Sequence, residues 1–162
     1  MSLFDLLPSL KGILVSRSFD PALWPVPIHA SGSDIIIGTT DVCAEVLRHT
    51  CGYYVDSAGE PVCPAADDDA PHPVLVTRIA AAQVAGGRAV VHIDAALPLN
   101  SAIADLAFAG QCLAGATLAD ITVVDAAGHR RTVHAELPAS IVATETIVIA
   151  LRPVADRARI VV

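Results

Sequence analysis

The sequence predicts an all-β domain, a mainly antiparallel β barrel or sandwich, with one short α-helix and an extended N-terminal arm. Two observations predict this class. Four short strand-forming runs lie within about forty residues, between Gly52 and Ile93, and turn sequences separate them. Further along, residues 131–137 alternate polar with apolar side chains, as a strand does when one face is exposed to solvent and the other is buried.

A β-hairpin is predicted at residues 53–63. Tyr53, Tyr54 and Val55 are strand formers, the Asp-Ser-Ala-Gly sequence at 56–59 supplies a turn, and residues 60–63 return as a second short strand. A Gly-Gly pair at 86–87 is predicted to turn another hairpin.

Residues 1–31 are predicted to form the arm, and residues 32–162 a single β-rich domain in which 115–162 is a β-rich extension. Three prolines keep the backbone extended around Trp24, the only tryptophan. Two interpretations of Trp24 stay open. It covers one end of its own core, or it anchors another subunit, since tryptophan is favoured at binding hot spots. The predicted partner-binding residues are Phe19, Leu23, Trp24, Val26 and Ile28.

The segment between the arm and the first hairpin is less regular. The apolar run 35–37 ends at Gly38 and predicts a fully buried strand. Residues 40–49 fit either a helix begun by Thr40 or Asp41, or a strand, and the strand is preferred.

The single helix is predicted at residues 101–114, capped by Asn100 or Ser101 and ended by Gly115. Its apolar stripe at helical spacing is formed by Ile103, Leu106, Ala107 and Leu113. Beyond it, a turn at 125–128 separates two strands. Strands are predicted at 13–15, 121–124, 131–137, 141–142, 146–151 and 160–162.

Composition restricts the classes of partner. The 162-residue chain has a formal charge of −7, and Lys11 is its only lysine, so nucleic acid is excluded, because binding it depends on neutralising phosphates. No run approaches the ~20 apolar residues of a membrane span and no secretory signal is recognised, so neither a membrane partner nor disulfides are predicted. With 54% hydrophobic and 17% charged residues, we expect a homo-oligomer that buries apolar surface.

Cys43, His49, Cys51 and Cys63 are the best candidates for a metal site, because zinc accepts these donors. On an extended strand His49 and Cys51 point to the same face. Structural zinc sites usually bring ligands in close pairs such as C-x2-C, which this chain lacks. The pattern favours buried thiols, and no metal or other cofactor is predicted.

No catalytic residue is predicted. His92 with Asp94, and His134 with Glu136, share a strand face, as a general acid or base and its neighbour would. The wet face of an antiparallel strand produces the same pattern without catalysis. Ser57 lies in a turn rather than in a G-x-S-x-G elbow. The sequence therefore predicts a protein that is not an enzyme.

The order of elements in residues 52–106 is distinctive. A hairpin leads to an Asp-rich loop at 65–70, an apolar strand follows at 74–79, and a strand at 89–93 precedes an Ala/Leu-rich segment. This order resembles the small head decoration proteins of tailed bacteriophages, the lambda type. The chain departs from that family where the apolar strand opens with His72-Pro73 instead of glycine, and in the extension after Gly115.

The resemblance implies a structural virion protein, made in the host cytoplasm and placed on the capsid surface as a trimer. As a decoration or cement subunit it would bridge subunits of the major capsid protein or another shell protein. An apolar domain with a proline-rich arm also suits strand addition on a neighbour. Outside a virion the prediction is a cytoplasmic protein. Two alternatives stay open: a small metal- or thiol-dependent enzyme or sensor using Cys43, His49, Cys51 and Cys63, and a ligand-binding β domain using Trp24, Tyr53 and Tyr54.

Overall fold

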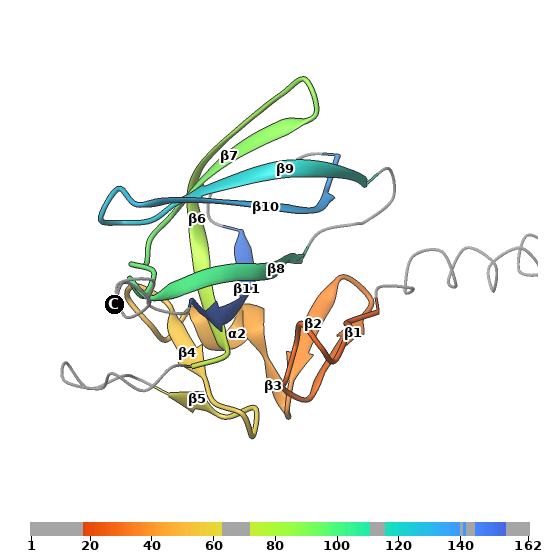
Figure 1. Ribbon diagram of the computed structural model, residues 1–162. Coiled ribbons are helices and arrows are strands. Elements are labelled where there is room, and N and C mark those ends of the chain that lie inside the picture. Colours follow the sequence, from red (N-terminus) through yellow and green to blue (C-terminus); the bar gives the residue numbers. More distant parts are fainter. Residues whose placement is uncertain (1–17, 63–71, 111–115, 140, 142–144, 155–162) are drawn as a thin grey trace, which may run out of the picture.

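The computed structural model describes residues 18–62, 72–110, 116–139, 141 and 145–154, and these residues form an all-β fold with one short helix (Figure 1). The helix, α2, spans Val42–Val46. The strands are β1 (Ile28–Ser31), β2 (Asp34–Ile37), β3 (Thr40–Asp41), β4 (Tyr53–Val55), β5 (Pro61–Val62), β6 (Val74–Ala85), β7 (Arg88–Ile93), β8 (Ser101–Ala109), β9 (Thr117–Val124), β10 (Arg130–Leu137) and β11 (Thr146–Pro153). The predicted fold class is confirmed.

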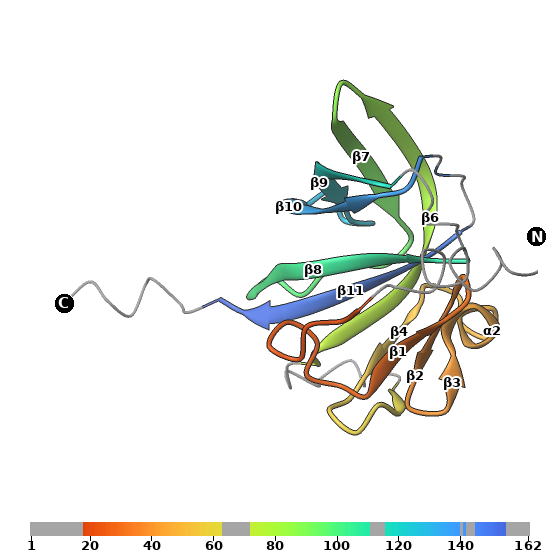
Figure 2. The same cartoon turned by 90° about the vertical axis from the view of Figure 1, so that its right-hand side faces the viewer.

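The larger sheet is open and has the strand order β10-β9-β7-β6-β11-β8, with β4 also paired to β6 and β5 paired to β4. Its neighbours pair antiparallel except β7 and β9, which pair in parallel. Strand β6 has an irregularity between Ile79 and Ala81; before it β6 pairs with β4 and β11, and after it with β7. The sheet therefore turns, so that β7, β9 and β10 lie over β8 and β11 (Figure 2).

Two apolar cores lie on the two faces of β6, β8 and β11. The first core lies between these strands and the layer of β7, β9 and β10, and includes Leu75, Val91, Phe108, Ile121, Val133, Ile147 and Ile149. The second core is covered by the small sheet β1-β2-β3 and by α2, and includes Trp24, Ile35, Val42, Tyr53, Val76, Val148 and Ala150. Because β11 is buried on both faces, its sequence is a continuous apolar run from Ile147 to Leu151.

The same burial explains why the helix predicted at residues 101–114 is wrong: residues 101–109 form strand β8. Leu106 and Phe108 face the first core, whereas Ala107 and Ala109 face the second. A strand that is apolar on both faces lacks the period of two, and the resulting run imitates helical spacing. Residues 111–115 lie outside the described part of the chain.

The helix lies instead in the ambiguous segment, so the preference for a strand at residues 40–49 is also wrong. Asp41 is the N-cap, and its Oδ1 accepts a 3.0 Å hydrogen bond from the backbone N–H of Cys43. Only Thr40 and Asp41 form a strand there. Nearby, Ile35 and Ile37 are buried but Ile36 is half-exposed, so the predicted strand is present without being buried throughout.

The predicted hairpins and turns are confirmed. Strands β4 and β5 pair antiparallel across residues 56–59, and the Gly-Gly pair at 86–87 joins β6 to β7. In β10 Thr132, His134 and Glu136 are exposed and the residues between them are buried. The strands predicted at 13–15 and 160–162, the Asp-rich loop at 65–70 and Val142 lie outside the described residues, and Ile141 is not in a strand.

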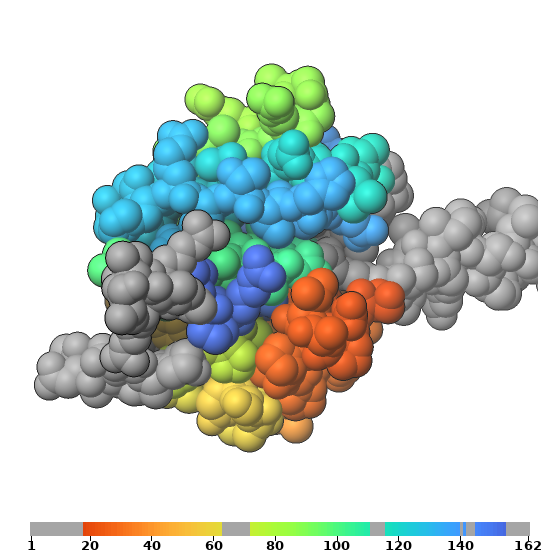
Figure 3. All heavy atoms as spheres, in the orientation of Figure 1, coloured from red at the N-terminus to blue at the C-terminus, as the bar shows by residue number. Residues whose placement is uncertain are grey.

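Residues 18–31 differ from the predicted arm, because they pack on the domain (Figure 3). Trp24 is 1% exposed in the second core, and β1 pairs with β2. Phe19 meets the Trp24 ring edge-on, with 5.3 Å between ring centroids. Trp24 therefore covers one end of its own core, as the first of the two interpretations states. Residues 1–17 lie outside the described residues.

No helix in the described part is long and apolar enough to cross a membrane.

Candidate apolar groove

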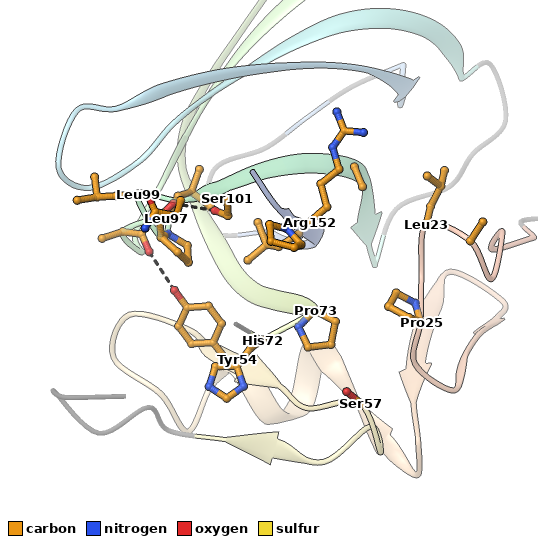
Figure 4. A pocket seen from close by; sticks show the side chains of 17 residues that line it. Leu23, Pro25, Tyr54, Ser57, His72, Pro73, Leu97, Leu99, Ser101 and Arg152 are labelled. Atoms are coloured by element: carbon orange, nitrogen blue, oxygen red, sulfur yellow. Dashed lines mark hydrogen bonds between the residues drawn. The ribbon is translucent and has the colours of Figure 1, made fainter. Parts of the chain in front are cut away.

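An open groove of about 1040 Å³ lies between segments that are far apart in the sequence (Figure 4). Residues 22–25 form one wall, the loop 96–100 forms the opposite wall, and the end of β11 and Pro73 lie between them. We call this feature the apolar groove, because leucine, proline and alanine make up most of its lining.

Tyr54 and His72 form one end of the groove. Strand β4 turns Tyr53 into the second core, so Tyr54, the next residue, points the opposite way. The Tyr54 ring lies 5.3 Å from the His72 ring between centroids, and its O–H donates a 3.3 Å hydrogen bond to the carbonyl of Ala96. Burial raises the pKa of Tyr54, and the charge of Asp125 adds to this effect. Tyr54 therefore stays a hydrogen-bond donor at neutral pH.

The loop 96–100 is held firmly. The backbone N–H of Leu97 donates to Oδ2 of buried Asp125 at 2.9 Å, and Arg131 Nη2 donates to the carbonyl of Pro98 at 2.8 Å. The Ser101 hydroxyl donates to the same carbonyl at 2.7 Å, and the N–H of residue 154 donates to the carbonyl of residue 100 at 2.8 Å. Together with the bond from Tyr54 to the Ala96 carbonyl, these hydrogen bonds fix a loop that contains no strand or helix of its own.

Asp125 is the centre of this support. It also accepts hydrogen bonds from the backbone N–H groups of Ala127 at 3.0 Å and His129 at 2.8 Å. Burial by itself would raise the pKa of the Asp125 carboxyl, but the hydrogen bonds from Leu97, His129 and Ala127 and the nearby His129 ring outweigh it and lower the pKa. The carboxylate is therefore ionised at neutral pH and ties the turn 125–128 to the loop.

This rigid loop presents a leucine to solvent. Leu99 is 74% exposed, and Leu23 on the opposite wall is 36% exposed. Figure 4 shows the two leucines on opposite sides of the groove. An exposed apolar side chain on a fixed support can be covered by a partner with little loss of conformational entropy.

The groove has an unusual charge for this chain. Among the described residues its lining includes Arg152 and no Asp or Glu, although the whole chain has 17 acidic and 10 basic residues. Within the described residues no carboxylate pairs with Arg152. In Figure 4 Arg152 lies between Ser101 and Leu23. The groove can therefore accept an apolar segment that has a negative group at one point.

Of the predicted partner-binding residues, only Leu23 is exposed. Trp24 is buried, and Phe19, Val26 and Ile28 are half-buried against the second core. Leu99 and Arg152 were not predicted. The sequence signal that could have indicated the exposed leucine is Leu-Pro-Leu-Asn at 97–100. Its proline favours a loop rather than a helix or strand, next to an apolar residue.

The four residues that were considered as metal ligands do not form a group of three in the described part of the chain. Cys51 is exposed, Cys63 lies outside the described residues, and His49 Nε2 lies 3.2 Å from Glu45 Oε1. A different set is brought together by the β2–β3 hairpin and α2. The ligand atoms of Asp34, Asp41 and Cys43 all lie within 4.8 Å of one another.

Burial raises the pKa of the Cys43 thiol, and the negative charges of Asp41, Asp34 and Glu145 raise it further. A hydrogen bond with Thr146 acts in the opposite direction but does not compensate. Cys43 is therefore a protonated thiol at neutral pH, a poor nucleophile and a poor metal ligand unless a cation displaces the proton.

The residues that were considered for catalysis and for ligand binding have other surroundings in the structure. His134 shares the wet face of β10 with Glu136 but pairs across the sheet with Asp120, at 3.0 Å between Nδ1 and Oδ1, and both side chains are more than half exposed. Of the aromatic residues considered for ligand binding, Trp24 and Tyr53 are buried in the second core. Only Tyr54 lines the groove.

No protein-family model, curated protein or solved structure matches this chain.

Proposed function

We propose that this protein is a non-enzymatic assembly subunit that binds partner subunits through the apolar groove between Leu23 and Leu99. One observation carries the proposal: Leu99 is 74% exposed, yet the loop that holds it is fixed by Asp125, Arg131 and Ser101. An assembly subunit gains a preorganised contact from a leucine that is held in place beside a second exposed leucine on the same groove.

Covering a fully exposed leucine side chain contributes about 1.5–3 kcal/mol. Leu99, 74% exposed, therefore contributes more to binding than Leu23, which is 36% exposed on the same groove. The groove is also partly open to solvent rather than enclosed, which suits a polypeptide segment better than a fully enclosed small molecule.

In its most specific form, the proposed subunit is a virion decoration or cement protein, a trimer that bridges subunits of a capsid. The support for this form is the order of elements in residues 52–106 together with the apolar composition. Of these elements, the hairpin at 53–62, the strand from residue 74 and the strand at 88–93 are present in the described structure.

Light scattering tests the proposal. We expect the full chain to have a mass above that of the 16.7 kDa monomer, and Leu99→Glu to reduce it to the monomer mass without changing the far-UV circular dichroism spectrum. The matched control is Leu47→Glu, because Leu47 is 72% exposed but lies beyond α2, outside the groove lining. A chain that is monomeric at every concentration, or that associates equally well with Leu99→Glu, would contradict the proposal.

A further inference from the structure

We propose that the occupant of the apolar groove is residues 3–7 of a second copy of this chain, with Asp5 of one copy paired with Arg152 of the other. This inference rests on the proposed function, because it names the partner segment of the same groove. It also goes further, since it makes the assembly an exchange between identical chains.

The charge of the groove carries the first step. Of the described residues that line the groove, Arg152 is the only Lys, Arg, Asp or Glu, and no carboxylate in the described ranges pairs with it. A guanidinium at the side of an apolar groove favours a partner that brings a carboxylate among apolar side chains, because the pair then fixes the register of the bound segment.

The chain itself contains a segment of this composition. Residues 3–7 are Leu-Phe-Asp-Leu-Leu, four large apolar residues around a single carboxylate, and Asp5 is the only charged residue before Lys11. These residues lie outside the described part of the chain, so their composition and their position in the sequence are what identify them.

The length of chain between this segment and the groove allows the exchange. Residues 8–17 separate the segment from Ser18, and residues 22–25 are already a wall of the groove. Ten residues can span up to about 33 Å, comparable to the diameter of a small domain, so this length of chain permits the segment of one copy to enter the groove of another. Exposed Leu23 and Leu99 on the two walls would then contact the incoming segment.

Charge exchange between full-length chains tests this contact. We expect Asp5→Arg alone and Arg152→Asp alone each to weaken association by about tenfold or more, because each places like charges together in the groove. An equimolar mixture of the two variants is expected to regain association, since each variant then supplies the charge that complements the other. The matched control is Arg88→Asp, which makes the same charge change at an exposed position in β7, outside the groove lining.

The outcomes separate this inference from the function on which it rests. Suppose that Leu99→Glu abolishes association and that the mixture of Asp5→Arg with Arg152→Asp does not associate. The groove then binds partner subunits, and residues 3–7 are not its occupant. If the double variant Asp5→Arg/Arg152→Asp regains the wild-type behaviour whereas the mixture does not, the segment returns to its own groove and exchange between copies is refuted. If Leu99→Glu has no effect either, the proposed function falls as well.

Discussion

The indole Nε1 of Trp24 donates a 2.9 Å hydrogen bond to Oδ2 of Asp105, a residue 81 positions further along the chain. The other oxygen of the same carboxylate, Oδ1, accepts from the backbone N–H of Leu106 at 2.9 Å. This contact fastens residues 18–25 to β8. One wall of the apolar groove is therefore built on the second core rather than on a free arm.

Removing the acceptor is expected to loosen this wall. Asp105→Ala leaves the N–H of a buried tryptophan without a partner, so we expect the free energy of unfolding to fall by about 1–3 kcal/mol in urea denaturation. Asp105→Asn keeps an acceptor oxygen and is expected to lose less. Equal stability of Asp105→Ala and the wild type would show that the bond contributes nothing.

Asp125 is expected to make stability depend on acid. Its pKa is lowered in the folded state, so its contribution is fully present above the ordinary carboxyl range, near pH 4, and is lost as the pH falls through the lower folded pKa. We expect Asp125→Asn to destabilise the protein at pH 7 by on the order of 2 kcal/mol and to flatten this acid dependence.

The control for Asp125 is Asp120→Asn, which removes an exposed carboxylate that pairs with His134 and is expected to cost at most about 1 kcal/mol. Because Asp125 also holds Leu97, association should weaken with Asp125→Asn but not with Asp120→Asn. An unchanged acid transition in Asp125→Asn would refute the role assigned to this carboxylate.

The two described cysteines are expected to differ in reactivity. Cys43 is half-buried with a raised pKa, whereas Cys51 is exposed. In variants that keep only one cysteine each, alkylation by iodoacetamide at pH 8 should be at least roughly tenfold slower at Cys43 than at Cys51. Equal rates would mean that Cys43 is neither shielded nor held protonated.

Gly52 is expected to tolerate no side chain. Its φ is +86°, and a Cβ there would collide with the carbonyl oxygen of Val76 and lie 2.9 Å from the Thr77 Cβ. We expect Gly52→Ala to destabilise the protein by about 3 kcal/mol or more. Gly86 also has a positive φ, of +59°, but has open space around it, so Gly86→Ala should cost only about 1 kcal/mol. Similar losses at the two positions would contradict the close approach at Gly52.

The alternation of polar and apolar residues predicts secondary structure correctly where one face of an element is exposed to solvent. Strand β10 follows the predicted alternation because Thr132, His134 and Glu136 face water while the residues between them face the first core. Strand β8 contributes residues to both cores and has no solvent-exposed face, so its apolar run imitates helical spacing and predicts a helix wrongly. The real helix has a capping residue, Asp41, but at five residues it is too short to show a period.

The groove could not be predicted from the sequence, because its walls come from residues 22–25, 54, 96–100 and 151–153. Nothing in local spacing brings these segments together; the turn of β6 and the packing of residues 18–25 on β8 do so. The metal-binding set that the structure brings together could not be predicted for a related reason. The register of the β2–β3 hairpin, rather than the spacing of cysteines, places Asp34 beside Asp41 and Cys43.

If this chain binds partner subunits through its apolar groove, its association depends on Leu99, and light scattering of the full chain across a range of concentrations measures that dependence. We predict a mass that rises above the monomer for the wild type and for Leu47→Glu, and that stays at the monomer for Leu99→Glu. A wild-type chain that remains monomeric throughout, or a Leu99→Glu chain that assembles like the wild type, would contradict it.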